Sequence, residues 1–282
     1  MKDPRYRVYD DGTSMRLSIG DEYYSDPNTP EEEKVSVQTL SYAYEPGSHR
    51  RAVFVFLYYL HHLSARHQKH WESHQISGDF RMDKDYMDRT LRGEFTDNCS
   101  IYEALLEEER QVNVLCAPIG KPPLFKKEYE RNELPNFNHL LRPTLRSYDD
   151  FTMILEKLVP GNINTTFFKD DISFTDERGE DISQQTIKLL EKWFNTFYHP
   201  RDPNALAAVF RALRGIRTER QAPAHKINPD EYNEEYFKKQ KDLMVSAYRA
   251  VQALRLMLSN HPAVRSAGYH PPDWLEQGKI KL

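Results

Sequence analysis

An arginine and a histidine stand five positions apart in the segment 217–226, with a glutamine and a lysine beside them. The guanidinium of Arg220 keeps its charge at any physiological pH and offers a planar set of donors that matches phosphate oxygens. The imidazole of His225 can accept or donate a proton near neutral pH, because the ordinary pKa of histidine is about 6.5. Gln221 and Lys226 add a polar and a cationic group. This combination indicates proton transfer on a substrate that carries a phosphate.

Two amphipathic segments flank this pair. Their apolar residues recur at helical spacing: Leu206, Val209, Phe210, Leu213 and Ile216 before the pair, and Tyr236, Leu243, Ala247, Val251, Leu254 and Leu258 after it. Pro223 marks a break between them, because proline cannot donate a backbone hydrogen bond and is tolerated mainly in the first turn of a helix. The sequence therefore predicts Arg220 at the end of one helix and His225 near the start of the next.

The Arg-polar-x-x-x-His pattern between two helices resembles the motif of the HEPN superfamily, all-helical domains that include many metal-independent ribonucleases. Arg220, Gln221 and His225 match the shortest spacing of that motif, and the helical context extends the resemblance over residues 183–260. The resemblance implies that His225 transfers protons, that Arg220 stabilises charge on the phosphate, and that Gln221 assists. It also implies a homodimer, because protomers of that family usually pool their motifs. No metal or other cofactor is expected.

RNA suits this chemistry because it carries its own nucleophile, the 2′-hydroxyl, and would leave a 2′,3′-cyclic phosphate. The helix before the motif also carries four arginines at intervals of three: Arg211, Arg214, Arg217 and Arg220. Positions three apart on a helix rotate backwards by about 60°, so these residues form a slanting basic stripe that leads to the motif. With Lys226, the stripe is predicted to bind the RNA backbone. An ordinary exposed helix face, on which arginine is a good helix former, is the alternative.

Other interpretations of the motif remain open. Arg220 could pair with Glu219 or Asp230 while His225 caps a helix. The same spacing recurs by chance between Arg265 and His270, and a one-residue longer version joins Arg255 to His261. The protein could instead be a non-catalytic module of the same family that binds RNA or a nucleotide. It could also be a protein-interaction subunit, since its 17 tyrosines and 14 phenylalanines suit a protein partner.

One control known in the family is not expected. Some members carry a tyrosine two residues after the histidine, which a partner nucleotidyltransferase adenylylates. Ile227 occupies that position here. The hypothesis for the biological role is toxin-type or anti-phage defence, with a regulatory protein as a possible further partner.

Composition favours a soluble cytoplasmic protein. Hydrophobic residues make up 39% and charged residues 29% of the 282 positions, and the net charge is −4, so RNA binding must use a local basic patch. No run of 18 apolar residues is present, so no membrane span is expected. The start of the chain lacks the apolar segment of a secretory signal. The two cysteines, Cys99 and Cys116, are expected to be free thiols.

The fold expected is mostly α, a HEPN-like helical bundle with elaborations. Four long helices are predicted at 51–74, 184–198, 203–219 and 230–259, the second capped by Ser183 and the third opened by Asp202 and Pro203. Shorter helices are expected at 83–92, 151–158 and 100–110, the last capped by Ser100. A β-hairpin is predicted from Val8 to Ile19 around an Asp-Gly turn.

Three regions are expected within one compact unit. These are an N-terminal extension (1–50), a helical and irregular region packed on the core (51–160) and the HEPN-like region (161–282). His67, His70 and His74 fall on one face of the first predicted helix, with the spacing of metal ligands. Because zinc would need further ligands, a helix that turns polar as it leaves the core is the favoured interpretation.

Overall fold

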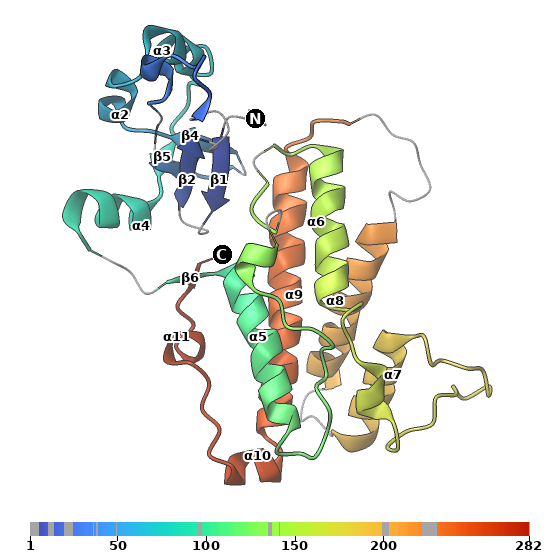
Figure 1. Ribbon diagram of the computed structural model, residues 1–282. Coiled ribbons are helices and arrows are strands. Elements are labelled where there is room, and N and C mark those ends of the chain that lie inside the picture. The colour runs from blue at the N-terminus through green and yellow to red at the C-terminus, as the bar shows by residue number, and fades with distance from the viewer. Residues whose placement is uncertain are drawn as a thin grey trace. The chain divides into compact units, whose positions relative to one another are not determined.

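A computed structural model describes residues 6–10, 14–19, 25–35, 37, 39–48, 50–94, 98–134, 137–140, 142–198, 203–221 and 230–281. The chain divides into two compact units, Met1–Asp97 and Asn98–Leu282 (Figure 1). The division differs from the expected one, because neither residue 50 nor residue 160 is a boundary. The helices between residues 98 and 160 belong with the C-terminal helices.

The first unit is a small antiparallel sheet with short helices. Its strands follow the order β1-β2-β3-β4, and β5 pairs with β3. A small core of Val37, Leu40, Tyr42 and Leu63 lies in this unit. The strands are β1 (Tyr6–Asp10), β2 (Ser14–Ile19), β3 (Thr39–Tyr44), β4 (Arg51–Phe54) and β5 (Arg81–Met82). The helices are η1 (Glu31–Glu33), α2 (Leu57–His61), α3 (Ala65–Glu72), α4 (Lys84–Met87) and the π-helical turn η2 (Asp88–Arg92).

Two predictions for this unit are resolved by the strand pairing. The N-terminal hairpin is confirmed as the antiparallel pair of β1 and β2, in which Asp10 pairs with Met15, and the predicted Asp11-Gly12 turn lies outside the described residues. The helix predicted over 51–74 is wrong. Residues Arg51–Phe54 pair with β3, and the exposed Leu57 begins a separate short helix. The apolar spacing came from three elements, because valine and phenylalanine also suit a strand.

The second unit is mostly α, as predicted. Helices α5, α6, α8 and α9 pack side by side, and α9 contacts each of the other three (Figure 1). Its long elements are α5 (Ile101–Cys116), α6 (Leu145–Leu158), α7 (Thr186–Phe197), α8 (Pro203–Gln221) and α9 (Glu235–Ser259). Its short elements are β6 (Cys99–Ser100), η3 (Arg131–Glu133), η4 (Thr165–Phe168), α10 (Pro262–Ser266), α11 (Asp273–Glu276) and β7 (Ile280–Lys281). In the bundle, α5 and α6 take the place expected for a helix at 51–74.

Local signals account for several helix ends. Ser100 Oγ accepts a hydrogen bond from the Glu103 N–H (3.3 Å), so Ser100 caps α5 as predicted. The helix predicted at 151–158 is α6, which begins six residues earlier at a Thr144 cap. Ser183 is not the cap of α7, because that helix begins at Thr186 after Gln185. Helix α8 begins at Pro203 as predicted, and Asp202 lies outside the described residues.

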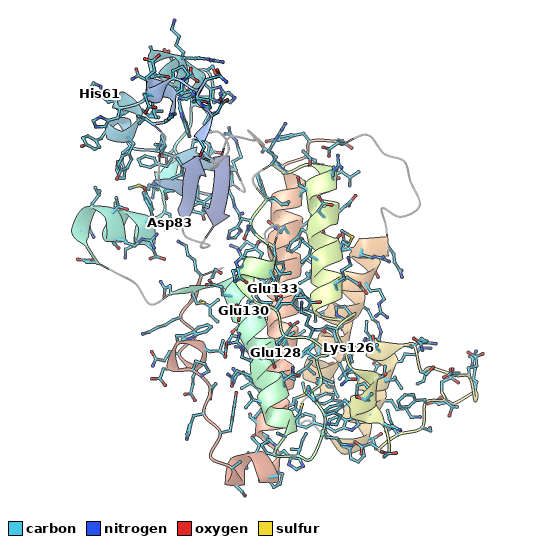
Figure 2. All side chains as sticks on the ribbon, in the orientation of Figure 1. His61, Asp83, Lys126, Glu128, Glu130 and Glu133 are labelled. Atoms are coloured by element: carbon cyan, nitrogen blue, oxygen red, sulfur yellow. The ribbon has the colours of Figure 1, made fainter. Side chains whose placement is uncertain are left out.

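A buried ion pair joins the two helices with the most extensive contact, α5 and α9. Glu108 is fully buried and Arg255 is 4% exposed. Arg255 donates from Nη2 to Glu108 Oε1 (3.1 Å) and from Nε to Glu108 Oε2. The Tyr248 hydroxyl lies 3.5 Å from Oε1. Burial raises the pKa of Glu108, and the Arg255 guanidinium acts in the opposite direction. Figure 2 shows the described side chains as sticks on the ribbon.

The next residue on α5, Glu109, has no such partner. It is 2% exposed, and neither carboxyl oxygen has a hydrogen-bond partner among the described residues. Burial raises the pKa of Glu109 well above its ordinary value. A carboxyl group in this surrounding is stable only in its protonated form.

The first prediction concerns the buried ion pair. Arg255→Ala leaves the Glu108 carboxylate buried without its partner, and we expect the free energy of unfolding to fall by about 3–5 kcal/mol in urea denaturation. The double variant Glu108→Leu/Arg255→Met should recover most of this loss, because it removes both charges. Arg249→Ala, at an exposed position of α9, is the control and should change stability by less than about 0.5 kcal/mol. A double variant as unstable as Arg255→Ala would contradict this account.

The second prediction concerns pH. Because the pKa of Glu109 is higher in the folded than in the unfolded chain, its contribution to stability is full below the ordinary pKa of 4.5 and is lost as pH rises towards the folded pKa. Glu109→Gln removes this titration. The stability of the variant relative to the native chain should therefore increase between pH 5 and pH 8, by up to about 1.4 kcal/mol per pH unit. Urea unfolding at several pH values measures the difference, and a pH-independent difference would refute it.

Candidate functional site

The predicted arginine–histidine motif begins at the carboxyl end of α8. Arg220 and Gln221 are the last two residues of the helix, and both are exposed. The next long helix, α9, begins at Glu235. His225 and Lys226 lie outside the described residues, so the structure places the arginine and glutamine of the motif and not the histidine and lysine.

The chain that leads into α9 is tied to the start of α6. Leu145 donates its N–H to the Glu231 carbonyl (2.9 Å), and Asn233 donates its N–H to the Pro143 carbonyl (2.8 Å). Asp230 Oδ1 accepts a hydrogen bond from the Arg146 N–H (3.0 Å). The described residues on either side of the motif are therefore the end of α8 and a stretch that is hydrogen-bonded to the start of α6.

A tyrosine connects α6, α8 and α9 at this end of the bundle. The Tyr148 hydroxyl donates to Glu219 Oε2 (2.9 Å), and the Tyr148 ring stacks on Tyr236 with 5.2 Å between ring centroids. Burial raises the pKa of Tyr148, and the neighbouring Glu219 carboxylate raises it further. The hydroxyl therefore stays protonated and remains a donor to Glu219.

These contacts bear on the alternative in which Arg220 is neutralised by Glu219 or Asp230. Glu219 accepts from Tyr148, and Asp230 accepts from the backbone of Arg146. Within the part of the chain that the structure describes, no ion pair involves Arg220. Arg220 is thus an exposed cation at the end of a helix.

The expected basic stripe on α8 is divided into paired and unpaired arginines. Arg214 forms an ion pair with Glu191 of α7. Arg217 Nε lies 3.9 Å from Glu156 Oε1 of α6, and its Nη2 donates to Thr186 Oγ1 (3.2 Å). Arg211 is exposed and, among residues with described positions, has no ion pair. Of the four arginines in the stripe, Arg211 and Arg220 are therefore the two whose charges no described carboxylate pairs with.

Carboxylates gather on the α6 side of this site. Burial raises the pKa of Asp149, and the charges of Asp150 and Asp230 raise it further. A phosphate would be repelled from this side, so it would approach Arg220 along α8.

The two other arginine–histidine pairs have structural partners. Arg255 is buried against Glu108. His261 Nδ1 accepts a hydrogen bond from the Ala263 N–H (3.2 Å) and caps α10. Arg265 Nη2 donates to Asn260 Oδ1 (2.6 Å). Arg220 differs from both of these arginines.

His67, His70 and His74, which have the spacing of metal ligands, make other contacts in the structure. His67 is buried with Nε2 3.9 Å from Glu33 Oε2, and His74 Nδ1 lies 2.8 Å from the His70 carbonyl oxygen. Over the described ranges, no group of three or more His, Cys, Asp or Glu residues could hold a metal ion. Cys99 and Cys116 are free, and burial raises the pKa of each to about 12, so both remain thiols.

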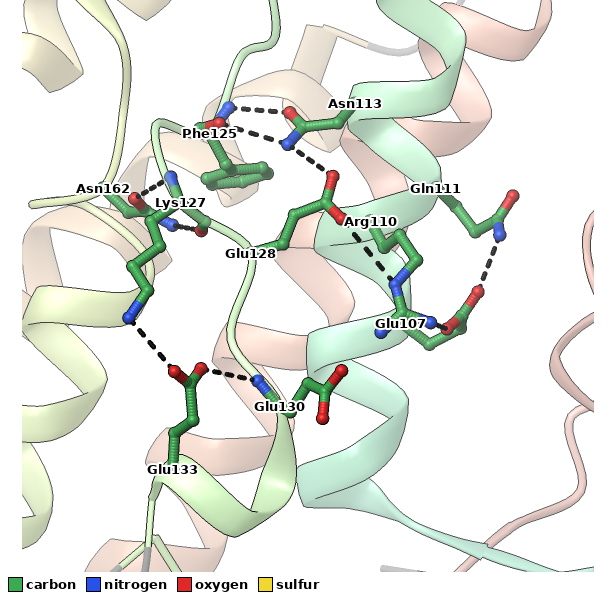
Figure 3. Close-up of polar contacts among 10 residues, drawn as sticks. All are labelled: Glu107, Arg110, Gln111, Asn113, Phe125, Lys127, Glu128, Glu130, Glu133 and Asn162. Carbon is green, nitrogen blue, oxygen red and sulfur yellow. Dashed lines mark hydrogen bonds and ion pairs between the residues drawn. The ribbon is translucent and has the colours of Figure 1, made fainter.

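A groove on α5 was not predicted from the sequence. It encloses about 180 Å³ between α5, the segment that enters η3, and α11. Figure 3 shows three of the lining residues, Glu107 and Arg110 of α5 and Glu130 of the facing segment. We call it the α5 groove; its lining is Glu103, Leu106, Glu107, Arg110, Tyr129, Glu130, Arg131 and Trp274. The lining comes from three separate parts of the chain, which no local pattern joins.

Comparison with family models, with curated proteins and with solved structures found no match for this chain. No helix in the described portion is long and apolar enough to cross a membrane.

Proposed function

We propose that this protein is a metal-independent endoribonuclease of the HEPN type. The observation that carries the proposal is the state of Arg220, an exposed arginine at the end of α8 for which the described residues supply no ion pair. The sequence places Gln221 next to it and His225 five positions later, in the connection between two long helices of a mostly α unit.

The chemistry follows from the residue types. His225 accepts the proton of the RNA 2′-hydroxyl, whose oxygen forms a bond to the phosphorus as the bond to the 5′-oxygen breaks. Arg220 stabilises the charge that develops on the phosphate, with Gln221 and Lys226 close to it in sequence. The leaving 5′-oxygen needs a proton, and a single histidine cannot serve as base and acid together. His225 of a second protomer would supply that proton, so the proposal includes a homodimer. The products are a 2′,3′-cyclic phosphate and a 5′-hydroxyl.

The setting that suits such an activity is toxin-type or anti-phage defence in the cytoplasm, with a regulatory protein that restrains cleavage. A second candidate is a module that binds RNA or a nucleotide without cleaving it. The exposed Arg211 and Arg220 support the binding module as well as they support the ribonuclease, because they would attract phosphates whether or not His225 reacts. Removal of the histidine distinguishes the two.

The third prediction tests which arginines contact RNA. Arg211→Ala and Arg220→Ala should each weaken RNA binding across sequences and reduce the slope of log affinity against log salt by about 1. Arg214→Ala should change the slope less, because Glu191 already compensates its charge. Binding to a single-stranded RNA, measured by fluorescence anisotropy at several salt concentrations, gives the three slopes. Equal effects of Arg211→Ala and Arg214→Ala would contradict the division of the stripe.

The fourth prediction tests catalysis. His225→Ala should abolish cleavage and preserve RNA binding, and Arg220→Ala should lower the cleavage rate by about 10²–10³-fold. Cleavage should survive EDTA and leave a 2′,3′-cyclic phosphate, as measured by mass spectrometry of the products. The active species should sediment at about twice 33.3 kDa.

The control variants for this test are His261→Ala and His270→Ala, which belong to the other arginine–histidine pairs and should cleave at the native rate. Cleavage that persists in His225→Ala, or that requires a divalent metal, would refute the site. If the native chain binds RNA but does not cleave it, the binding module is favoured.

A further inference from the structure

Two aromatic side chains line the α5 groove. Tyr129 comes from the segment before η3 and Trp274 from α11, and both are half-buried. Leu106 of α5, which is 8% exposed, gives the groove an apolar surface. The volume of about 180 Å³ is smaller than the roughly 300–1,000 Å³ of pockets for drug-sized ligands. A lining of this size and composition suits one planar ring, because aromatic side chains offer π-faces for stacking.

The polar groups of α5 are spread along the groove. Glu103 and Arg110 are seven residues apart, or about 10 Å along the helix axis at 1.5 Å per residue. Arg110 Nη1 donates to Glu107 Oε2 (3.0 Å), and its Nε lies 3.9 Å from Glu128 Oε2 (Figure 3). The groove therefore has a guanidinium towards one end and a carboxylate towards the other.

The carboxylate of Glu103 is oriented by neutral donors. Its Oε2 accepts hydrogen bonds from Cys99 Sγ (3.1 Å) and Ser100 Oγ (3.3 Å). Because Cys99 stays a thiol, these contacts hold the carboxylate in place without cancelling its charge. Glu130, on the facing segment, has no ion pair with any residue of described position. Because both of these bonds end on Oε2 of Glu103, its Oε1 keeps two free lone pairs and is the oxygen that can accept from two adjacent N–H groups.

We propose that the α5 groove binds the guanine base of a nucleotide. Guanine is the neutral base whose Watson–Crick edge presents two adjacent donors, N1–H and N2–H. Adenine and cytosine place a ring acceptor beside their amino group, and uracil places a carbonyl on each side of its N–H, so all three would meet the Glu103 carboxylate with repulsion. The O6 and N7 acceptors of guanine match an arginine, and Arg110 offers Nη2, since its Nη1 donates to Glu107 and its Nε lies 3.9 Å from Glu128 Oε2. Trp274 stacks on the ring, and Tyr129, over whose ring Lys127 Nζ lies 4.3 Å from the centroid, lines the groove beside it.

This proposal goes beyond the cleavage site and does not depend on it. The guanine could belong to a free nucleotide or to an RNA strand. Both sources present the same base, and binding measurements on the whole chain distinguish them without any need for cleavage.

The experiment is isothermal titration of the full chain with 5′-GMP, 5′-IMP, 5′-AMP, 5′-CMP and 5′-UMP. GMP should bind at least about tenfold more tightly than AMP, CMP or UMP. IMP, which lacks the N2 amino group, should fall between GMP and AMP. A short RNA with a single guanine should bind much more tightly than GMP if RNA is the source, and no more tightly if the source is a free nucleotide.

Two variants assign the binding to this groove. Glu103→Gln places an amide donor opposite the N–H groups of guanine and should weaken GMP binding by about tenfold or more. Trp274→Ala removes one stacking surface, with a loss of similar size. Glu103→Gln is the deciding variant if Trp274→Ala folds poorly, since it keeps the backbone N–H of Glu103 that bonds to the cap Ser100 and keeps a side-chain oxygen that can accept from Ser100 Oγ. The controls are Glu235→Gln and Phe197→Ala, at exposed positions away from the groove.

Equal affinity for the four common nucleotides, or the absence of binding at millimolar GMP, would overturn the proposal. Tighter binding of free arginine or spermidine than of GMP would assign the groove to organic cations and would also overturn it. GMP binding that is unchanged in Glu103→Gln would place the guanine elsewhere on the chain.

Discussion

The ion pair between Glu108 and Arg255 constrains the rest of the second unit. Two charges removed from water are costly unless their geometry is good, so the pair fixes how α5 and α9 lie along one another. A second buried contact lies near the N-terminus of α9. There Gln240 accepts a hydrogen bond from the Leu140 N–H (3.0 Å) and donates one to the Asn138 carbonyl (2.7 Å). With both contacts made, each end of a 25-residue helix is positioned. One end lies against Tyr148 near the end of α8, and the other continues into the segment that carries Trp274.

The arginines of this protein differ because of their partners and not because of their type. Arg255 has a structural role, since its charge is neutralised by the buried carboxylate of Glu108. At the surface, Arg214 pairs with a carboxylate of α7 and Arg217 with a carboxylate of α6. Such exposed pairs contribute little to stability, but each carboxylate offsets the positive charge of its arginine. Arg211 and Arg220 keep their charges available to a ligand. Spacing along the helix suggested one continuous stripe, and the neighbouring helices divided it.

Periodicity predicted the parts of the fold in which local signals agree. Helices α8 and α9 follow long apolar repeats, and the Ser100 cap correctly opened α5. The prediction of a helix over 51–74 was wrong because Val53 and Leu60 fit a helical spacing but belong to β4 and α2, with Phe56 between them as the residue before α2. At the candidate site, the sequence supplied the residue types of the motif. The partners of Arg214 and Glu219 lie 23 and 71 residues away, so no local pattern could have revealed which cations stay unpaired. The α5 groove could not be predicted for the same reason, because its lining comes from three separate parts of the chain.

The run Glu107-Glu108-Glu109-Arg110 contained information that periodicity alone did not use. Successive helical residues are about 100° apart, so four charged residues in a row spread over about 300° and cannot all face solvent on a packed helix. The structure resolves the conflict in three ways. Glu107 pairs with Arg110 at the surface, Glu108 finds Arg255 on α9, and Glu109 remains buried without a described partner and keeps its proton. A charged run that encircles a helix within a bundle therefore predicts a buried charge, and with it a partner on a neighbouring helix or a group of raised pKa.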